Sequence, residues 1–152
     1  MILNTGTEVI LSSFIGACAA QWLKLAFYWV KHKKPNFRIL TVTGGMPSSH
    51  SSLSMALTTS VGMIRGFAST EFAIALGFSM VIMYDAAGLR RSAGKMATVL
   101  NKIVDDIYSD KPTKFPNERL MELLGHTPIE VFMGALLGIV LALAVHLLLL
   151  IY

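Results

Sequence analysis

The chain has 152 residues, enough for one domain, and hydrophobic residues make up 54% of it while charged residues make up only 14%. Its mean hydropathy of +0.61 excludes an ordinary soluble protein and indicates an integral membrane protein. The pI near 9.4 would suit a nucleic-acid-binding protein, but the basic residues flank apolar segments, so nucleic acid is excluded as a partner. Cys18 is the single cysteine, which excludes an internal disulfide.

The first predicted membrane span runs from Val9 to Val30, long enough as a helix to cross a bilayer of about 30 Å. It contains Lys24, which is unusual inside a span. Two interpretations stay open: the lysine extends along its stem to the membrane interface, or it faces a polar interior.

The next segment, residues 44–52, reads Gly-Gly-Met-Pro-Ser-Ser-His-Ser-Ser. The two glycines allow a tight turn, and Pro47 is predicted to be the first residue of a new helix. Ser48, Ser49 and His50 would then occupy a helical first turn, where unpaired N–H groups favour an anion such as phosphate. The alternative is a Gly/Pro loop and a serine cap, with His50 merely solvated.

Three further apolar segments follow. Residues 47–64 are too short and too polar for an independent span and are predicted to form a helix buried among others. Glu71–Leu89 and Pro128–Tyr152 are predicted spans. The fold expected is therefore all-α: a small polytopic membrane bundle of about four membrane helices, forming one domain over residues 1–152.

The polar segment between the last two spans has apolar residues at helical spacing, and these are Met96, Val99, Leu100, Ile103, Val104 and Ile107. This pattern predicts an amphipathic cytoplasmic helix, lying on the membrane surface or against the bundle. A mobile loop is predicted over residues 109–116, and a short helix from Asn117 to Gly125.

Positively charged residues are distributed unevenly between the connecting segments. The N-terminal tail has none, and the 65–70 turn has only Arg65, whereas residues 31–38 and 90–119 carry most of the others. The positive-inside rule therefore predicts that both chain ends lie outside and both long loops lie in the cytoplasm.

The same topology brings unusual polar side chains from four segments into one layer at the cytoplasmic side. They are Lys24, His50, Asp85, Arg90, Arg91, His126, Thr127 and Glu130. Ionisable groups at membrane depth are costly, so this layer is a candidate functional site. Simpler interpretations stay open, because Asp85 could only pair with Arg90 or Lys24, and His126 could only precede a helix capped by Thr127. A metal site built from His50, His126 and Asp85 is a further alternative, although none of the three shows ligand spacing in the sequence.

These groups suit phosphoryl transfer. A histidine nitrogen can attack phosphorus, and a second histidine can protonate the leaving oxygen. Lysine, arginine and helix N-terminal amides can hold the phosphate oxygens. His126 and Glu130 are four residues apart on a predicted helix, so the carboxylate can fix the tautomer of the imidazole.

Three motifs carry a family resemblance. Pro47-Ser48-Ser49-His50 resembles the Pro-Ser-Gly-His motif of the type-2 phosphatidic acid phosphatases, relatives of the vanadium haloperoxidases. His126-x-x-x-Glu130 resembles their His-x-x-x-Asp, and Lys24 with Lys31 resembles their Lys-x6-Arg-Pro. Three longer stretches, residues 44–51, 84–95 and 123–131, are similar to a divergent bacterial and plant branch, and the resemblance covers residues 10–150.

The resemblance implies a bacterial cell-membrane enzyme that removes phosphate from a lipid phosphate or a polyprenyl (di)phosphate through a phosphohistidine, without a cofactor or metal. In family terms His126 would be the nucleophile and His50 the acid. Glu130 and the Asp85 of the polar layer complete the expected catalytic set. The expected phosphate ligands are Lys24, Ser48, Ser49, Arg90 and Arg91. The alternative is a membrane protein that binds phospholipid or isoprenoid phosphate without turnover, and a homo-oligomer is compatible with either.

The sequence departs from the motifs at several positions. Ser49 replaces the motif glycine, His32 stands in the place of a proline, and Glu130 replaces aspartate. Arg119 is one residue too far from His126 for the usual arginine of the third motif. We expect Arg90 or Arg91 to take the place of that missing arginine.

Overall fold

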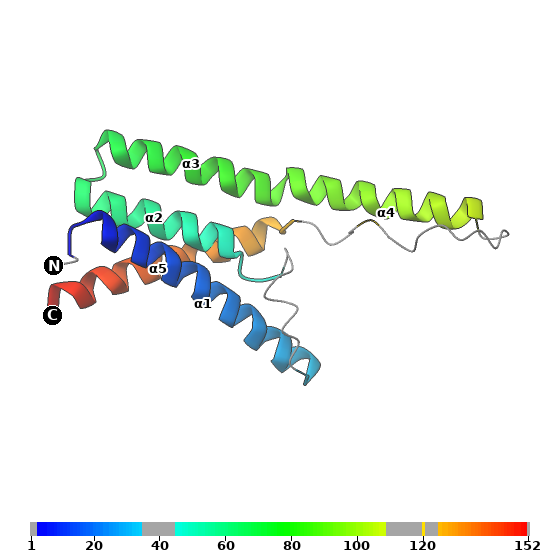
Figure 1. Ribbon diagram of the computed structural model, residues 1–152, viewed down its shortest axis with the longest axis horizontal. Coiled ribbons are helices and arrows are strands. Elements are labelled where there is room, and N and C mark those ends of the chain that lie inside the picture. Colours follow the sequence, from blue (N-terminus) through cyan, green and yellow to red (C-terminus); the bar gives the residue numbers. More distant parts are fainter. Residues whose placement is uncertain (1–2, 35–44, 109–119, 121–124, 152) are drawn as a thin grey trace.

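The computed structural model describes residues 3–34, 45–108, 120 and 125–151, without the side chains of residues 89–91 and 106–108. The described residues form helices and no strands, which confirms the all-α prediction. The helices are α1 (Gly6–His32), α2 (Ser49–Arg65), α3 (Thr70–Ala87), α4 (Leu89–Tyr108) and α5 (Pro128–Ile151). Both termini lie at one end of the bundle, here named the terminal end, and α2 and α5 begin at the other, named the site end (Figure 1).

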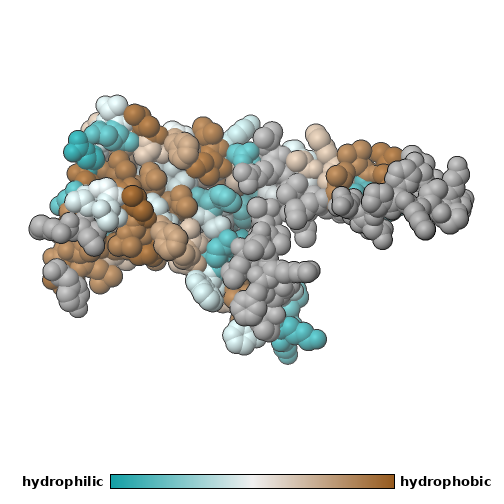
Figure 2. Space-filling view, viewed as in Figure 1, coloured by the Kyte–Doolittle hydropathy of each residue, from teal (hydrophilic) through white to brown (hydrophobic). Residues whose placement is uncertain are grey.

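Three described segments are long and apolar enough to cross a membrane: Gly6–His32, Thr70–Asp105 and Pro128–Ile151. Large hydrophobic side chains such as Ile10, Phe78 and Phe132 are exposed on them. Hydrophobic residues cover much of the face shown in Figure 2. A surface of this kind is stable only against lipid, so the protein is a membrane protein.

Helix α2 lies at the centre of the bundle and packs against α1, α3 and α5. It has 17 residues, and its buried positions are mostly small or hydroxyl-bearing. A Cβ at Gly134 or Gly138 of α5 would collide with backbone atoms of α2, so only glycine permits this close approach. Residues 47–64 were predicted to form a buried helix, and α2 occupies that place.

Serine hydroxyl groups form hydrogen bonds between α2 and its neighbouring helices. The Ser52 hydroxyl donates to the Gly16 carbonyl oxygen of α1 at 2.9 Å. On the opposite side, the Ser79 hydroxyl of α3 donates to the Ser54 carbonyl oxygen at 2.9 Å. Hydrogen bonds between membrane helices replace the hydrophobic driving force that is weak inside lipid, so they hold α2 in register.

The start of α2 differs from the prediction by two residues. The helix begins at Ser49, and Ser48 is its N-cap, so Pro47 does not lie in the first turn. The Ser48 hydroxyl accepts a hydrogen bond from the Ser51 N–H at 3.4 Å, and the Ser48 N–H donates to the Glu130 carbonyl oxygen of α5 at 3.0 Å. The serine takes the cap because its hydroxyl can bond a first-turn amide, which proline cannot do.

Helix α4 continues in the direction of α3 and extends away from the rest of the bundle (Figure 1). The predicted amphipathic helix is confirmed, and its stripe of Met96, Val99, Leu100, Ile103 and Val104 is exposed. The interpretation that the stripe packs against the bundle is therefore wrong for these residues. The predicted loop at 109–116 and the helix at 117–125 lie outside the described residues, apart from Leu120 and Gly125.

Candidate active site

His126 and Glu130 form a hydrogen-bonded pair at the start of α5. Glu130 Oε2 lies 3.1 Å from His126 Nδ1 and accepts the Thr127 N–H at 3.0 Å. The Glu130 N–H donates in turn to the Thr127 hydroxyl at 3.3 Å. This reciprocal capping box fixes the carboxylate, and Pro128 begins the helix, where its missing N–H costs nothing.

The pair determines which imidazole nitrogen is available for chemistry. Glu130 Oε2 already accepts the Thr127 N–H, and with the same oxygen as acceptor for the imidazole, Nδ1 of His126 carries the proton and Nε2 presents a lone pair. The His126 side chain is 3% exposed, and its backbone N–H donates to the Ala86 carbonyl oxygen of α3 at 2.9 Å. Hydrogen bonds to both its side chain and its backbone therefore fix the position of His126.

Lys24 is buried beside this pair. Only 5% of the residue is exposed, and its methylene stem packs against Gly45, where an added Cβ would lie 3.5 Å from the lysine carbons. Gly45 has φ of +84°, a conformation that glycine adopts without strain. The lysine does not extend to an interface, so the interpretation that it faces a polar interior is the one that fits. Its charge acts on both Glu130 and His126.

The surroundings of His126 lower the pKa of its imidazole. Burial is the main cause, because it disfavours the charged ring. The hydrogen bond to Glu130 opposes this shift, and the positive charge of Lys24 lowers the pKa further. The net effect keeps His126 neutral at pH 7, which is the form in which a histidine nitrogen attacks an electrophile.

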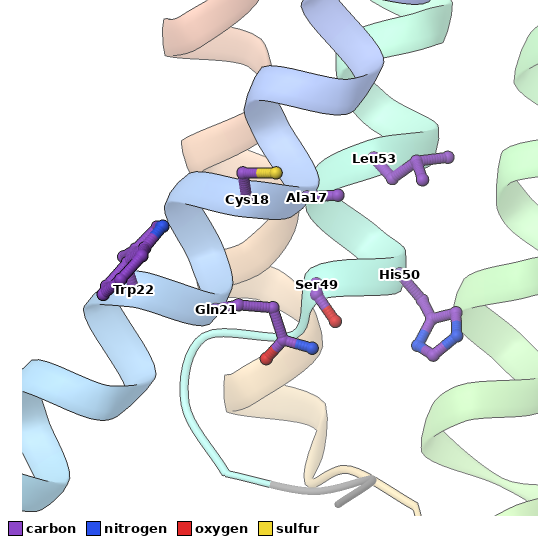
Figure 3. Close-up of a pocket in the computed structure, with 7 residues that line it drawn as sticks. All are labelled: Ala17, Cys18, Gln21, Trp22, Ser49, His50 and Leu53. Atoms are coloured by element: carbon purple, nitrogen blue, oxygen red, sulfur yellow. The ribbon is translucent and has the colours of Figure 1, made fainter. Parts of the chain in front are cut away.

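His50 lies in the first turn of α2, where it is exposed and close enough that its charge acts on His126. Together with Ser49 it lines a cavity of about 410 Å³ between α1 and α2. Figure 3 shows the imidazole on the α2 side of this cavity, with Cys18 and Trp22 on α1 across from it. A group bound here would meet both an acid–base residue and apolar walls.

The remaining predicted site residues are placed differently. Ser48 is fully buried and acts as the cap of α2, so its hydroxyl is engaged within the protein. Asp85 is half-buried at the end of α3, next to the residue whose carbonyl accepts the His126 N–H. Arg90 and Arg91 lie in α4, and their side chains fall outside the described part of the chain.

The structure thus brings Lys24, His50, Ser49, His126 and Glu130 to the site end of the bundle. The contact between Gly45 and the Lys24 stem was not predicted from the sequence. The Gly-Gly pair before Pro47 was the feature that could have indicated it. The cavity at Cys18 and Trp22 was not predicted either, because periodicity does not show which face of α1 meets α2. Among the described residues, no three His, Cys, Asp or Glu side chains are grouped so that they could hold a metal ion.

Fold and site together define a helical membrane protein in which the buried His126 is paired with the partly exposed Glu130 and lies near the buried Lys24. Residues 5–141 match the Divergent PAP2 family, a branch related to the type-2 phosphatidic acid phosphatases, and the chain belongs to this family. It is also 42% identical over 143 residues to the uncharacterized membrane protein YuiD of Bacillus subtilis (strain 168), covering 88% of this chain and 90% of that protein. No solved structure matches the chain.

Proposed function

We propose that the protein is a membrane-bound hydrolase that removes phosphate from a lipid phosphate or a polyprenyl (di)phosphate through a phosphohistidine intermediate. The observation that carries the proposal is the buried His126, whose Nδ1 is fixed by Glu130 and whose neighbour is the buried cation Lys24. A neutral, oriented imidazole beside a cation suits attack on an anionic ester, because the cation offsets the charge of the incoming group.

The reaction proceeds in two displacements. Nε2 of His126 attacks phosphorus, the bond to the ester oxygen breaks, and His50 gives its proton to that oxygen so that an alcohol leaves. In the case of a diphosphate, a monophosphate leaves instead. Water, deprotonated by His50, then attacks the phosphohistidine, which releases inorganic phosphate and restores both histidines. Glu130 stabilises the charge that develops on the His126 ring in each step.

The phosphate oxygens are assigned to Lys24, Ser49 and the first turn of α2. Both α2 and α5 begin at the site end, so the positive ends of two helix dipoles point toward an anion bound there. Arg90 and Arg91 are proposed as further phosphate ligands on sequence grounds, and Asp85 as the residue that positions one of these cations. Ser48 contributes by capping α2 rather than through a free hydroxyl.

The test measures phosphate release from a panel of lipid phosphates by purified protein in detergent, with and without a chelator. The wild type should release phosphate in both cases. His126→Ala should lose about 10⁴–10⁶-fold in kcat, the scale seen when a covalent nucleophile is removed. The matched control is His32→Ala, an exposed histidine that stacks on Tyr28 at the end of α1 and should keep full activity.

His50→Ala provides a second arm. It should cost about 10²–10⁴-fold with an alkyl leaving group and much less with an acidic aryl leaving group, since acid assistance matters most for a basic oxygen. Turnover that survives in both His126→Ala and His50→Ala would overturn the hydrolase proposal. Phosphate-lipid binding without any turnover in the wild type would instead favour a carrier or scaffold.

We also propose that the site faces the cytoplasm, supported by the basic residues near the site end and their scarcity at the terminal end. In a Cys18→Ala chain, a cysteine at Ser109 should resist a membrane-impermeant thiol reagent in intact cells. A cysteine at the exposed Ala68, in the turn between α2 and α3, should react. The reverse pattern would place the site on the outer side.

A further inference from the structure

The cavity between α1 and α2 has two kinds of wall. Cys18 and Trp22 on α1 and Leu53 on α2 give it apolar surface, and Gln21, Ser49 and His50 supply its polar groups (Figure 3). Its volume of about 410 Å³ lies within the usual range for small-molecule sites. Such a cavity suits an amphiphilic ligand whose polar group lies at the start of α2.

The position of His50 determines which part of a substrate enters this cavity. In the proposed reaction His50 protonates the oxygen that departs, so the organic group attached to that oxygen must lie on the His50 side of the phosphate. The cavity is the apolar space onto which His50 opens. The phosphate itself would lie toward Lys24 and His126.

A second cavity lies on the other flank of α1, between α1 and α5, with a volume of about 260 Å³. It is lined by apolar residues that include Phe27, Met46 and Leu136. His50 lines the first cavity and does not line this one. The two cavities therefore differ in whether they adjoin the acid, although both offer apolar walls within the membrane.

We propose that the cavity beside His50 holds the hydrocarbon chain of the leaving group, and that the substrate is a single-chain phosphate ester such as a prenyl or alkyl phosphate. The inference rests on the proposed function. In a two-chain phospholipid phosphate both chains depart with the same oxygen, so both would have to lie on the His50 flank. The α1 helix separates that flank from the second cavity, so the His50 flank offers a cavity for one chain and a second chain would have no cavity of its own there.

The first test compares kcat/KM for alkyl phosphates of increasing chain length, with a water-soluble aryl phosphate as the chain-free reference. Each methylene that enters the cavity should raise kcat/KM by about fourfold until the cavity is full. Leu53→Trp should fill the cavity and flatten this dependence on chain length. Leu136→Trp, which fills the second cavity, is the matched control and should keep the wild-type dependence.

A two-chain phospholipid phosphate with the same total number of carbons should be turned over at least tenfold more slowly than its single-chain counterpart. Equal rates for the two lipids would overturn the proposal while leaving the phosphatase activity in place. A wild-type dependence on chain length in Leu53→Trp would overturn it as well.

The second test does not depend on turnover. Cys18 is the only cysteine of the chain, so its rate of reaction with a maleimide reports on the cavity alone. An alkyl phosphate should slow this reaction at least tenfold, whereas inorganic phosphate or an alkanol of the same length should not. Protection without phosphate release would reject the hydrolase and keep the cavity as a chain-binding site. Equal protection by the alkanol would show that any hydrocarbon fills the cavity, and would overturn the assignment to a phosphate ester.

Discussion

In the described part of the chain two histidine–carboxylate pairs are found, one at each end of the bundle, and they differ in how far apart their members are in the sequence. At the site end, His126 and Glu130 are four residues apart in one capping box. At the terminal end, His146 Nδ1 lies 2.6 Å from Glu8 Oε1, although 138 residues separate them in the chain. The first pair organises a local turn, and the second joins α1 to α5.

The helix dipoles distinguish the two pairs further. His126 precedes α5, where the positive end of the dipole disfavours an imidazolium and attracts anions. Glu8 lies in the first turn of α1 and His146 lies in the second half of α5, so the carboxyl group stands at a helix start and the imidazole does not. The Asn4 N–H also donates to Glu8 Oε2 at 2.7 Å, which engages the second carboxylate oxygen.

A histidine–carboxylate pair inside a membrane protein therefore does not by itself indicate a reactive site. The terminal-end pair is satisfied by the protein, with Glu8 fully buried. The site-end pair adjoins Lys24, His50 and a cavity that opens between helices. A site for an anion differs from a structural contact in two respects: it has additional positive charge next to the pair, and a cavity through which a ligand can reach it.

The largest expected effect comes from breaking the two pairs in parallel. Glu8→Ala leaves the His146 ring without its partner and should cost about 1–3 kcal/mol of stability, the cost of an unsatisfied buried polar group, measured as a lower melting temperature in detergent. Its turnover per folded molecule should stay near that of the wild type. Glu130→Ala removes a capping box and should cost only about 0.5–2 kcal/mol, but its turnover should fall severely.

The double variant Glu8→Ala/His146→Ala checks that the stability loss comes from the pair. Its effect should be smaller than the sum of the two single effects, because either substitution alone already breaks the contact. Lost turnover in folded Glu8→Ala would contradict the structural assignment and would make the terminal end a part of the reaction.

The sequence predicted the helices well, and it predicted one of the side-chain contacts at the site end. Long apolar segments gave α1, α3 and α5, and the serine-rich segment at 47–64 gave a buried helix because hydroxyls and small residues suit close helix contacts. The His126–Glu130 pair was predictable, since four residues on a helix bring two side chains to one face. Local spacing was sufficient for these features.

Contacts between distant segments were not predictable in the same way. Glu8 and His146 are 138 residues apart, and nothing local in the sequence relates one to the other. The burial of Lys24 depends on Gly45, and the start of α2 is tied to α5 by the bond from the Ser48 N–H to the Glu130 carbonyl oxygen. Each of these depends on how helices are placed against one another, which periodicity does not specify.

The last prediction concerns the effect of the Lys24 charge on the His126–Glu130 pair, since the terminal-end pair is not described with such a neighbour. Lys24→Met keeps most of the stem that packs against Gly45 but removes the charge. We expect kcat/KM at the pH optimum to fall about 10–100-fold, the scale of a lost charge-assisted hydrogen bond to the phosphate. The charge of Lys24 also lowers the pKa of His126, so its removal should raise that pKa.

Because the proposed nucleophile is neutral His126, activity is lost as the pH falls through the pKa of its imidazole, and this pKa sets the acid limb of kcat/KM. A raised pKa therefore moves the acid limb of Lys24→Met to higher pH. Lys95→Met, an exposed lysine of α4, is the matched control and should leave the limb in place. An acid limb that stays fixed or moves to lower pH in Lys24→Met would mean that the charge of Lys24 does not act on the His126 imidazole. The site-end pair would then differ from the terminal-end pair only in having a cavity beside it.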